Sequence, residues 1–371
     1  MQKLAAALDY MPLALAQAGA YIKQRGRRSL VGRYLAKLEK SEKSRANLLT
    51  SVSKELRRDQ EAQDSIILTW QISFDHIRVT RPSAADLLSL MSMYNYQGIP
   101  EYLLKARGSG VRPGARATSN FDGAECDSGA SSSASDDEGS EADDFENDIL
   151  MLENFHFIST TFLNTAFEMH RLVQLAARVW LRSHELYREW ARKGIEILDE
   201  TLPDGEHKNW ERCLELYPYV TSILELNEKD DSLSRALVQY KAAWFDWKRG
   251  LWSKAEALAA ESYKTRKLIL GQKDEKTLWT LSIHASVLGD QGKYEAAEEA
   301  SRQVLEVSEK VLGKEHPNTL ISLWCLADLM ERLGRKHDAL SLYDRVVISL
   351  STSLGVRHPH TLQCQGSLER L

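Results

Sequence analysis

The sequence of 371 residues has few of the features that mark secreted, membrane or metal-binding proteins. Its four cysteines form no CxxC pair, which argues against a disulfide framework and against a zinc site. No apolar run reaches the roughly 18 residues that a membrane-spanning helix needs. The first residues also lack the basic, apolar and small-residue order of a signal peptide. These absences favour a cytoplasmic protein with no membrane segment and no metal site, whose thiols are buried or incidental: Cys126, Cys213, Cys325 and Cys364.

The sequence also lacks a phosphate-binding loop of the form GxxxxGK[ST]. Its two Gly-Lys pairs, Gly292-Lys293 and Gly313-Lys314, lie inside the repeat described below. No run of four aliphatic residues ends in an aspartate either. Without such a loop there is no backbone cradle for phosphates and no lysine for the β- and γ-phosphates. We therefore expect that this chain alone neither hydrolyses nor tightly binds ATP, and no catalytic residue is assigned.

Charge is distributed unevenly. Residues 121–148 hold 11 acidic side chains and no basic one, which leaves 42 acidic against 48 basic residues elsewhere. The surrounding segment, residues 108–144, is rich in Gly, Ser, Ala, Asp and Glu and has few large apolar side chains, so we expect it to be disordered. Its serines suit an acidophilic kinase, although an inert insertion is the favoured interpretation. Its acidity and the lack of a dense basic stripe also argue against nucleic-acid binding.

The rest of the first half has mainly helical patterns. Residues 59–77 are amphipathic, a second helix is expected behind Pro82-Ser83, and a third follows Pro100. Residues 156–170 alternate β-forming side chains around a Leu-Asn-Thr turn, which predicts a short hairpin. Helices followed by a terminal hairpin are typical of a winged-helix arrangement.

The second half contains an internal repeat with a period of 42 residues. Residues 271–312 align with residues 313–354, and an earlier copy lies 42 residues before them. Each copy predicts two helices, in which one glycine ends the first helix and an alanine five residues later lets the helices approach closely. The matching positions are Gly250, Gly292 and Gly334, then Ala255, Ala297 and Ala339, then Gly271, Gly313 and Gly355.

Such helix pairs cannot bury their faces alone and stack into a superhelix. His316-Pro317 and His358-Pro359 end the loops between copies, with each proline suited to open the next helix. The sequence stops inside the first helix of a further copy, so we expect that end either to fray or to expose apolar surface. Whether Met1 is the true start of the protein stays open.

The repeat resembles the tetratricopeptide repeat in the long form found in kinesin light chains. The resemblance rests on the exact spacing of the glycines, and on the small residues Ala243, Ala285 and Ala327 that precede them by seven. An aromatic residue often follows the glycine by two in this family, as Trp252 and Tyr294 do. The resemblance implies a superhelix in which the first helix of each pair lines a concave, protein-binding face.

A second resemblance concerns residues 11–15, MPLAL, which are similar to the GLPLAL motif of NB-ARC domains, the nucleotide switch of STAND signalling ATPases. A winged helix and an MHD-type motif follow in that family, and Met169-His170 matches the latter, with Arg171 in place of the aspartate. The resemblance implies that Pro12 and His170 are vestigial or incomplete ADP contacts. The order of these motifs before tetratricopeptide repeats matches fungal NLR-like proteins.

The two resemblances together imply a mainly α fold. An NB-ARC-type helical subdomain would occupy residues 1–54, and a winged-helix region with the insert at 108–144 would occupy residues 55–182. A helical linker would span residues 183–230, and the tetratricopeptide array, with its last repeat incomplete, residues 231–371.

The concave face of the array is the predicted partner-binding groove, since aromatic anchors dominate binding energy. Packing between neighbouring repeats is the competing interpretation for any one ring. Counting back from the glycines places these residues in the groove: Tyr240, Trp244, Trp247, Trp279, Asp290, Trp324, Asp328 and Arg332.

Three functions remain open. The favoured one is a protein-interaction scaffold of a STAND-type signalling protein, which binds proteins or peptides in the groove without a P-loop of its own. The second is a fragment of an ATP/ADP-switching ATPase whose P-loop lies upstream, and the third is an adaptor like a kinesin light chain. The sequence does not fix the oligomeric state, and oligomerisation is compatible with all three.

Overall fold

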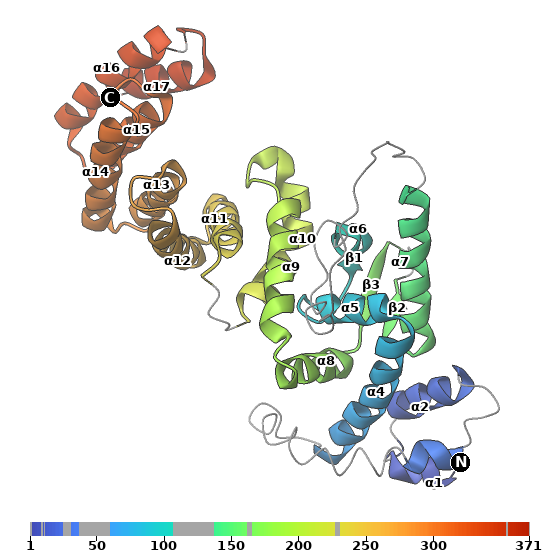
Figure 1. The fold of residues 1–371 in the computed structure, drawn as a ribbon. Coiled ribbons are helices and arrows are strands. Elements are labelled where there is room, and N and C mark those ends of the chain that lie inside the picture. Colours follow the sequence, from blue (N-terminus) through green and yellow to red (C-terminus); the bar gives the residue numbers. More distant parts are fainter. Residues whose placement is uncertain are drawn as a thin grey trace, which may run out of the picture. The chain divides into compact units, whose positions relative to one another are not determined.

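The structure, a computed structural model, describes residues 2–8, 10, 12–24, 31–36, 60–106, 137–161, 165–226, 231–353 and 355–370. They form two compact units. Unit 1 comprises Met1–Ile197 and Thr221–Glu228, and unit 2 comprises Leu198–Val220 and Lys229–Leu371. Helices dominate both units, as the sequence predicts (Figure 1).

Unit 1 consists of helices and one small sheet, and a further helical stretch covers residues 31–36. Its last helices, α9 and α10, are shared with unit 2. The elements are α1 (Gln2–Ala7), α2 (Pro12–Gln24), α4 (Gln60–Thr80), α5 (Pro82–Met91), β1 (Ile99–Pro100), α6 (Glu101–Lys105), α7 (Asp137–Asn154), β2 (Ile158–Thr160), β3 (Ala166–Met169), α8 (Arg171–Ser183), α9 (Tyr187–Thr201) and α10 (Trp210–Leu224).

The core of unit 1 is aromatic. Trp70 and Phe74 of α4 stack with ring centroids 4.5 Å apart, and Phe74 meets Trp180 of α8 edge-on at 5.0 Å. Each of these rings is at most 4% exposed. The amphipathic stripe predicted for residues 59–77 is therefore confirmed where its side chains are described. The helices expected behind Pro82 and after Pro100 are α5 and α6.

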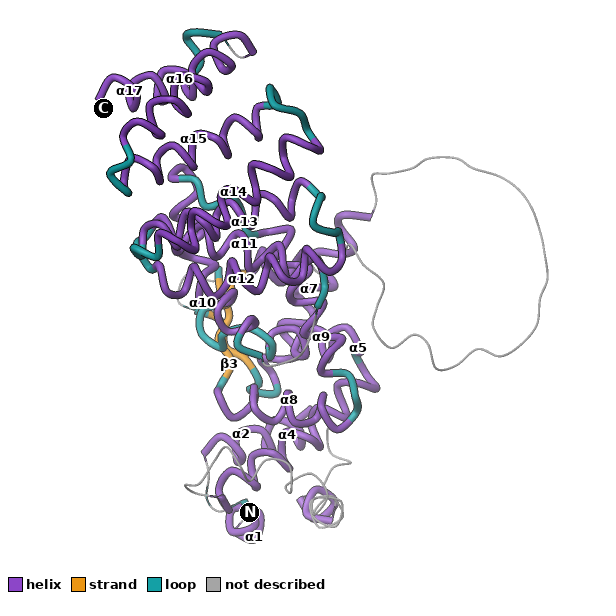
Figure 2. The backbone as a smooth tube through the Cα atoms, turned by 90° about the vertical axis from the view of Figure 1, so that its left-hand side faces the viewer, coloured by secondary structure: helices purple, strands orange, loops and turns teal. Residues whose placement is uncertain are grey.

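The three strands form one antiparallel sheet in the order β1–β3–β2. Strand β2 pairs with β3 from Ile158↔Met169 to Thr160↔Phe167, which confirms the predicted hairpin. Its tip, residues 162–164, lies outside the described residues. The short β1 completes the sheet through Ile99↔Phe167, and the strands are orange in Figure 2.

Helix α7 corrects part of the expected disorder. Most of the segment 108–144 lies outside the described residues, but residues 137–144 are helical and open α7. Here Asp148 is fully buried, with Ser83 Oγ 2.6 Å from its carboxylate and Arg81 paired to it. A second Arg81 contact reaches the Asp144 backbone oxygen at 2.8 Å. These contacts, together with burial of Phe145, offset the cost of ordering an acidic helix.

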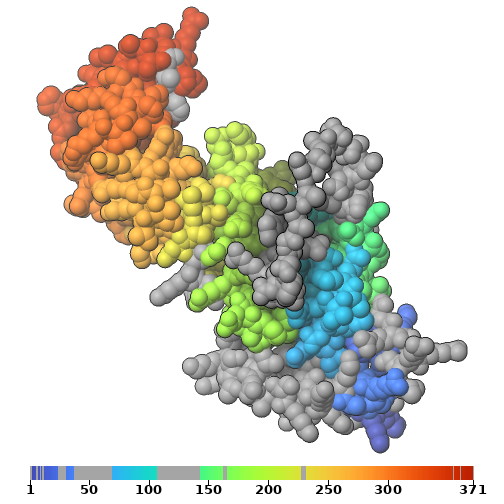
Figure 3. All heavy atoms as spheres, in the orientation of Figure 1, coloured from blue at the N-terminus to red at the C-terminus, as the bar shows by residue number. Residues whose placement is uncertain are grey.

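Unit 2 is a series of helix pairs, which run from yellow to red in Figure 1. The space-filling view shows them as one continuous packed body (Figure 3). A 3₁₀ turn at His207–Asn209 leads into α10 before the series begins. The pairs are α11 (Leu233–Lys248) with α12 (Trp252–Ile269), α13 (Glu275–Asp290) with α14 (Tyr294–Val311), and α15 (Pro317–Arg332) with α16 (Lys336–Ser353), followed by α17 (Pro359–Arg370).

The backbone follows the 42-residue period. Gly250, Gly292 and Gly334 have φ between +72° and +79°, a region that L side chains rarely adopt, and each second helix starts two residues later. The loops between pairs also turn at glycines with positive φ. The alanines predicted at the close approach, Ala255, Ala297 and Ala339, are completely buried.

The last helix differs from its counterparts at one apolar position. Leu278 and Leu320 are 4% and 0% exposed, whereas the matching Leu362 of α17 is 53% exposed. An apolar position that is buried in two copies is therefore exposed in α17.

Candidate functional site

The first helices of the three pairs, α11, α13 and α15, carry every residue that the sequence assigns to the groove. Their starting points are fixed by local capping. Asp274 accepts hydrogen bonds from the backbone N–H groups of Lys276 and Thr277 at the start of α13. His316 takes the same role for α15, where Pro317 occupies the first turn as predicted.

Two of the predicted groove residues, Trp247 and Arg332, bind a third, Asp290. Trp247 Nε1 donates to the Asp290 carboxylate over 2.6 Å, and the Arg332 guanidinium pairs with the same carboxylate. The hydrogen bond from Arg332 to Asp290 is the largest cause that raises the pKa of Arg332, and the negative charge of Asp290 adds to it. These residues tie α11, α13 and α15 together, so we call them the polar rib: Trp247, Asp290 and Arg332.

The aromatic residues of α11 are largely packing residues. Tyr240, Trp244 and Trp247 are half-buried and pack against Ala255, Ile283 and Val287. Each ring therefore exposes less of its surface than the groove assignment predicts, because it fills the junction between the first two helix pairs. The packing leaves each ring partly exposed, so the assignment of these residues to the groove stays a prediction.

A loop from the preceding segment also covers Trp244. A Cβ placed on Gly205 would lie 2.7 Å from Trp244 Cδ1 and 3.1 Å from the Phe245 backbone nitrogen. Only glycine permits this approach, and Trp210 Nε1 bonds to the Gly205 carbonyl over 3.1 Å. The fully buried Asp246 accepts a hydrogen bond from Tyr217 of α10. The expected helical linker thus closes one side of α11.

The remaining groove positions divide between core and surface. Trp324 is half-buried and packs on the apolar core that includes Leu326 and Leu350. Asp328 accepts a hydrogen bond from Tyr343, and burial raises the pKa of its carboxyl. Trp279 is half-buried and lines a cavity between α13, α14 and α15.

That cavity has a volume of about 30 Å³. It has room for about two groups the size of water, which suits the end of a side chain and is far too small for a cofactor. Its lining mixes apolar walls with hydroxyl, amide and carboxylate groups: Glu275, Leu278, Trp279, Ser282, Ser308, Leu312, Asn318, Ile321 and Ser322.

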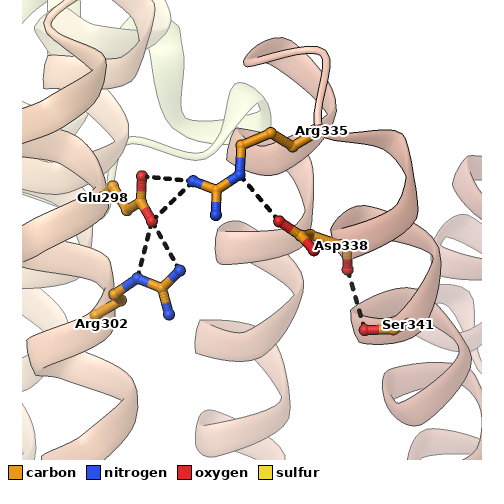
Figure 4. A network of polar contacts seen from close by, with 5 residues as sticks. All are labelled: Glu298, Arg302, Arg335, Asp338 and Ser341. Atoms are coloured by element: carbon orange, nitrogen blue, oxygen red, sulfur yellow. Dashed lines mark hydrogen bonds and ion pairs between the residues drawn. The ribbon is translucent and has the colours of Figure 1, made fainter.

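Charged pairs join successive repeats next to the second helices. Lys293 Nζ lies 2.7 Å from the Glu256 carboxylate. The equivalent pair one repeat later is Arg335 and Glu298, whose charged groups lie 3.0 Å apart. Figure 4 shows Arg335 between Glu298 of α14 and Asp338 of α16, with Arg302 on the other side of Glu298. The pairs are partly exposed, so they fix geometry more than they add stability.

The two residues assigned to ADP lie in unit 1. Pro12 is exposed at the start of α2, which confirms only that this motif opens a helix. His170 is exposed at the end of β3, and its Nδ1 accepts the backbone N–H of Leu172 over 3.2 Å as the N-cap of α8. This is the local role that competes with phosphate sensing.

Sequence reasoning missed the residues that shape the cavity. Ser308 and Asn318 come from α14 and α15, and Arg266 fills the matching space one repeat earlier. The 42-residue alignment contains the signal, because it places Arg266, Ser308 and Leu350 at one position. The side chain at this aligned position is large in the first copy, small in the second and large in the third. A search for exposed aromatic residues does not detect such a change.

Within the described residues, no group of three or more His, Cys, Asp or Glu side chains is arranged to hold a metal ion. No helix in the same part of the chain is long and apolar enough to cross a membrane. Cys213, Cys325 and Cys364 are unpaired thiols, and the first and last of these are buried.

Comparison with known proteins supports the repeat assignment and the wider resemblance. Residues 276–347 match the tetratricopeptide repeat family. A nucleotide-binding leucine-rich repeat (NLR)-like protein of Hyaloscypha variabilis is 28% identical over 286 residues, which cover 76% of this chain and 25% of that protein. The chain therefore spans about a quarter of the length of this relative.

Solved structures with some likeness are repeat proteins. A Podospora anserina putative kinesin light chain with nearly identical TPR-like repeats is 18% identical, over 47% of this chain and 92% of that one, with a TM-score of 0.36. BtubC (BKLC) from P. vanneervenii is 15% identical, over 53% and 75%, with a TM-score of 0.36. By the family match at residues 276–347 the chain carries tetratricopeptide repeats in its C-terminal half, and it is similar, over three quarters of its length, to a fungal NLR-like protein.

Proposed function

We propose that this chain is a protein-interaction scaffold that holds a peptide segment of a partner along α11, α13 and α15. The observation that carries the proposal is the cavity between α13, α14 and α15, which the half-buried Trp279 helps to line. The polar rib supports it, because a rigid array loses less entropy on binding than a flexible one. Tetratricopeptide repeats serve as protein-binding modules in general, and nothing in the site requires catalysis.

This function is tested by selecting peptides that bind the chain and then mapping where they bind. A library of short random peptides on phage is selected against the full chain, and a selected peptide is then added during hydrogen exchange. We expect slower exchange in α13 and α15, because a bound peptide covers their faces. Slower exchange confined to unit 1, or no saturable binder after selection, would contradict the proposal.

We further propose that the chain is the repeat-bearing part of an NLR-like signalling protein and that Pro12 and His170 do not hold ADP by themselves. The identity to the Hyaloscypha variabilis protein supports the first statement. The second rests on His170, whose imidazole already caps α8. Titration with a fluorescent ADP analogue is expected to give no saturable signal, whereas tight stoichiometric binding would favour the alternative of a nucleotide switch.

The winged-helix and NB-ARC assignments of unit 1 belong to the same proposal. Helices α4, α5 and α8 around a small sheet with a terminal hairpin support a winged-helix arrangement. In STAND proteins, such a subdomain is a packing element, and we propose this role here.

A further inference from the structure

Two positions of the repeat decide whether the space between consecutive pairs is filled. The first position is occupied by Tyr240, Ser282 and Trp324 in the three copies, and the second by Arg266, Ser308 and Leu350. The first junction thus has two large side chains, the middle junction has two serines, and the last junction again has two large side chains.

At the first junction the space is filled by a guanidinium group. Arg266 is only 2% exposed and lies over the Tyr240 ring, 4.5 Å from its centroid. Its Nη1 donates to the Lys276 carbonyl and to Thr280 Oγ1, each over 2.8 Å. The two acceptors are themselves linked, since Thr280 Oγ1 donates to the Lys276 carbonyl over 2.9 Å.

At the last junction the space is filled by apolar groups. Leu350 is completely buried, and Trp324 packs against the same core. Neither end junction therefore leaves room for an external group at this position.

The middle junction contains the cavity. Ser282 and Ser308 occupy the two positions here, and both line the cavity. Asn318 and Ser322, the counterparts of Lys276 and Thr280, line the cavity in the same arrangement, and Ser322 Oγ donates to the Asn318 carbonyl over 2.9 Å. At the first junction, a carbonyl and a hydroxyl accept hydrogen bonds from the Arg266 guanidinium. The equivalent carbonyl and hydroxyl are present at the middle junction, where serine replaces the arginine.

Two further residues match the chemistry of a guanidinium. The exposed Glu275 lines the cavity and accepts a hydrogen bond from the Asn318 side chain, which places a carboxylate at this site. Trp279 lines it too and supplies an aromatic ring three residues before Ser282, the counterpart of Tyr240. Lysine fits less well, because a compact, strongly hydrated ammonium gains less from an aromatic wall and lacks the fixed fork of donors that a guanidinium has.

We propose that the middle junction is a specificity pocket that receives an arginine side chain from the partner peptide, in the place that Arg266 occupies one repeat earlier. This rests on the proposed function, and it names the side chain that the groove selects. The guanidinium donates to the Asn318 carbonyl and Ser322 Oγ, faces Glu275 and packs against Trp279.

The peptides selected from the random phage library provide the first test. We expect arginine at one fixed position of the sequences that bind. Replacement of that arginine by lysine is expected to weaken binding about tenfold, since a hydrogen bond to a charged group is at stake. Selected peptides without an arginine preference would overturn the proposal.

Variants of the full chain provide the second test. Ser308→Arg fills the cavity from within and is expected to weaken binding of the selected peptide by at least about tenfold. Ala296→Arg, at an exposed position of the same helix, adds the same charge outside the cavity and serves as the control. Because S308R risks misfolding, Glu275→Gln is measured in parallel, with circular dichroism for each variant.

The two proposals fail in different ways. Peptides that slow exchange in α13 and α15 but tolerate both S308R and E275Q would refute the arginine pocket and leave the interaction scaffold intact. Absence of any saturable peptide would refute the scaffold itself. Equal loss of affinity in A296R and S308R would assign the effect to net charge, which also overturns the pocket.

Discussion

The indole nitrogen of Trp247 donates a hydrogen bond to the Asp290 carboxylate across 43 positions of sequence, one more than the repeat period. The counterpart of Asp290 in the preceding repeat is Lys248, so Asp290 binds the residue just before its counterpart. The Lys248 ammonium lies 4.2 Å from the centre of the Trp247 ring. The column Lys248, Asp290 and Arg332 alternates in charge from repeat to repeat. The Asp290 carboxylate thus binds one donor from each neighbouring repeat, Trp247 from α11 and Arg332 from α15.

Replacement of Asp290 by alanine should destabilise unit 2. The substitution removes the acceptor of both Trp247 and Arg332, and Trp247 is half-buried. The expected loss is about 1–3 kcal/mol in the free energy of unfolding, because a half-buried donor is left without a partner. Urea denaturation followed by circular dichroism measures it.

Asp290→Asn keeps the size of the side chain and is expected to lose less than D290A. Asp344→Asn, at an exposed position of α16, is the matched control and should leave the urea midpoint unchanged. Equal stability of D290A and D344N would show that the polar rib does not stabilise the array.

Substitutions of Arg266 should reproduce the other two junctions. Arg266→Ser recreates the hollow middle junction and is expected to cost about 2–4 kcal/mol, because a nearly inaccessible side chain and its packing on Tyr240 are lost. Arg266→Leu matches Leu350 of the last junction and is expected to stay within about 1 kcal/mol of the parent chain, since an apolar side chain replaces a buried charge.

Urea denaturation of the two Arg266 variants decides this prediction. Should R266L unfold as easily as R266S, the guanidinium contacts with Lys276 and Thr280 would be what holds the first junction together. The idea that this column only needs to be filled would then be wrong.

The sequence predicted the framework of the array well and the chemistry of its surface less well. Helix ends followed from Gly250, Gly292 and Gly334, because positive φ is a backbone requirement that one residue type meets. The state of Trp244 could not be predicted, because the loop at Gly205 that covers it comes from outside the repeat. The pairing of Trp247 with Asp290 was also missed, since it depends on how far each pair rotates relative to the next.

The charged pairs between repeats predict a pH dependence. The hydrogen bond from Lys293 lowers the pKa of Glu256, and those from Arg302 and then Arg335 lower the pKa of Glu298. A carboxyl whose pKa is lower in the folded state adds stability above its unfolded pKa of about 4.3, and loses it as the pH falls through the folded value.

Comparison of the parent chain with a Glu256→Gln/Glu298→Gln variant tests this dependence. We expect the parent to have the higher urea midpoint at neutral pH, by a small margin because the pairs are partly exposed. The margin should shrink with added salt and disappear once the pH falls below the folded pKa values of the two carboxyl groups. A margin independent of both pH and salt would mean that packing of the glutamate stems, and not charge, is responsible.

Gly292→Ala should destabilise the array although there is space for the added methyl group. No atom lies within 4 Å of a Cβ placed there, yet φ is +79°, so the cost is conformational strain of about 1–2 kcal/mol. Gly366→Ala is the matched control, because this glycine has the same free space but lies inside α17 with ordinary helical geometry. G366A is expected to gain about 0.5–1 kcal/mol, since alanine favours a helix interior. A loss in both variants would point to sterics, whereas opposite signs in urea denaturation would confirm that backbone conformation alone requires glycine between the two helices of each repeat.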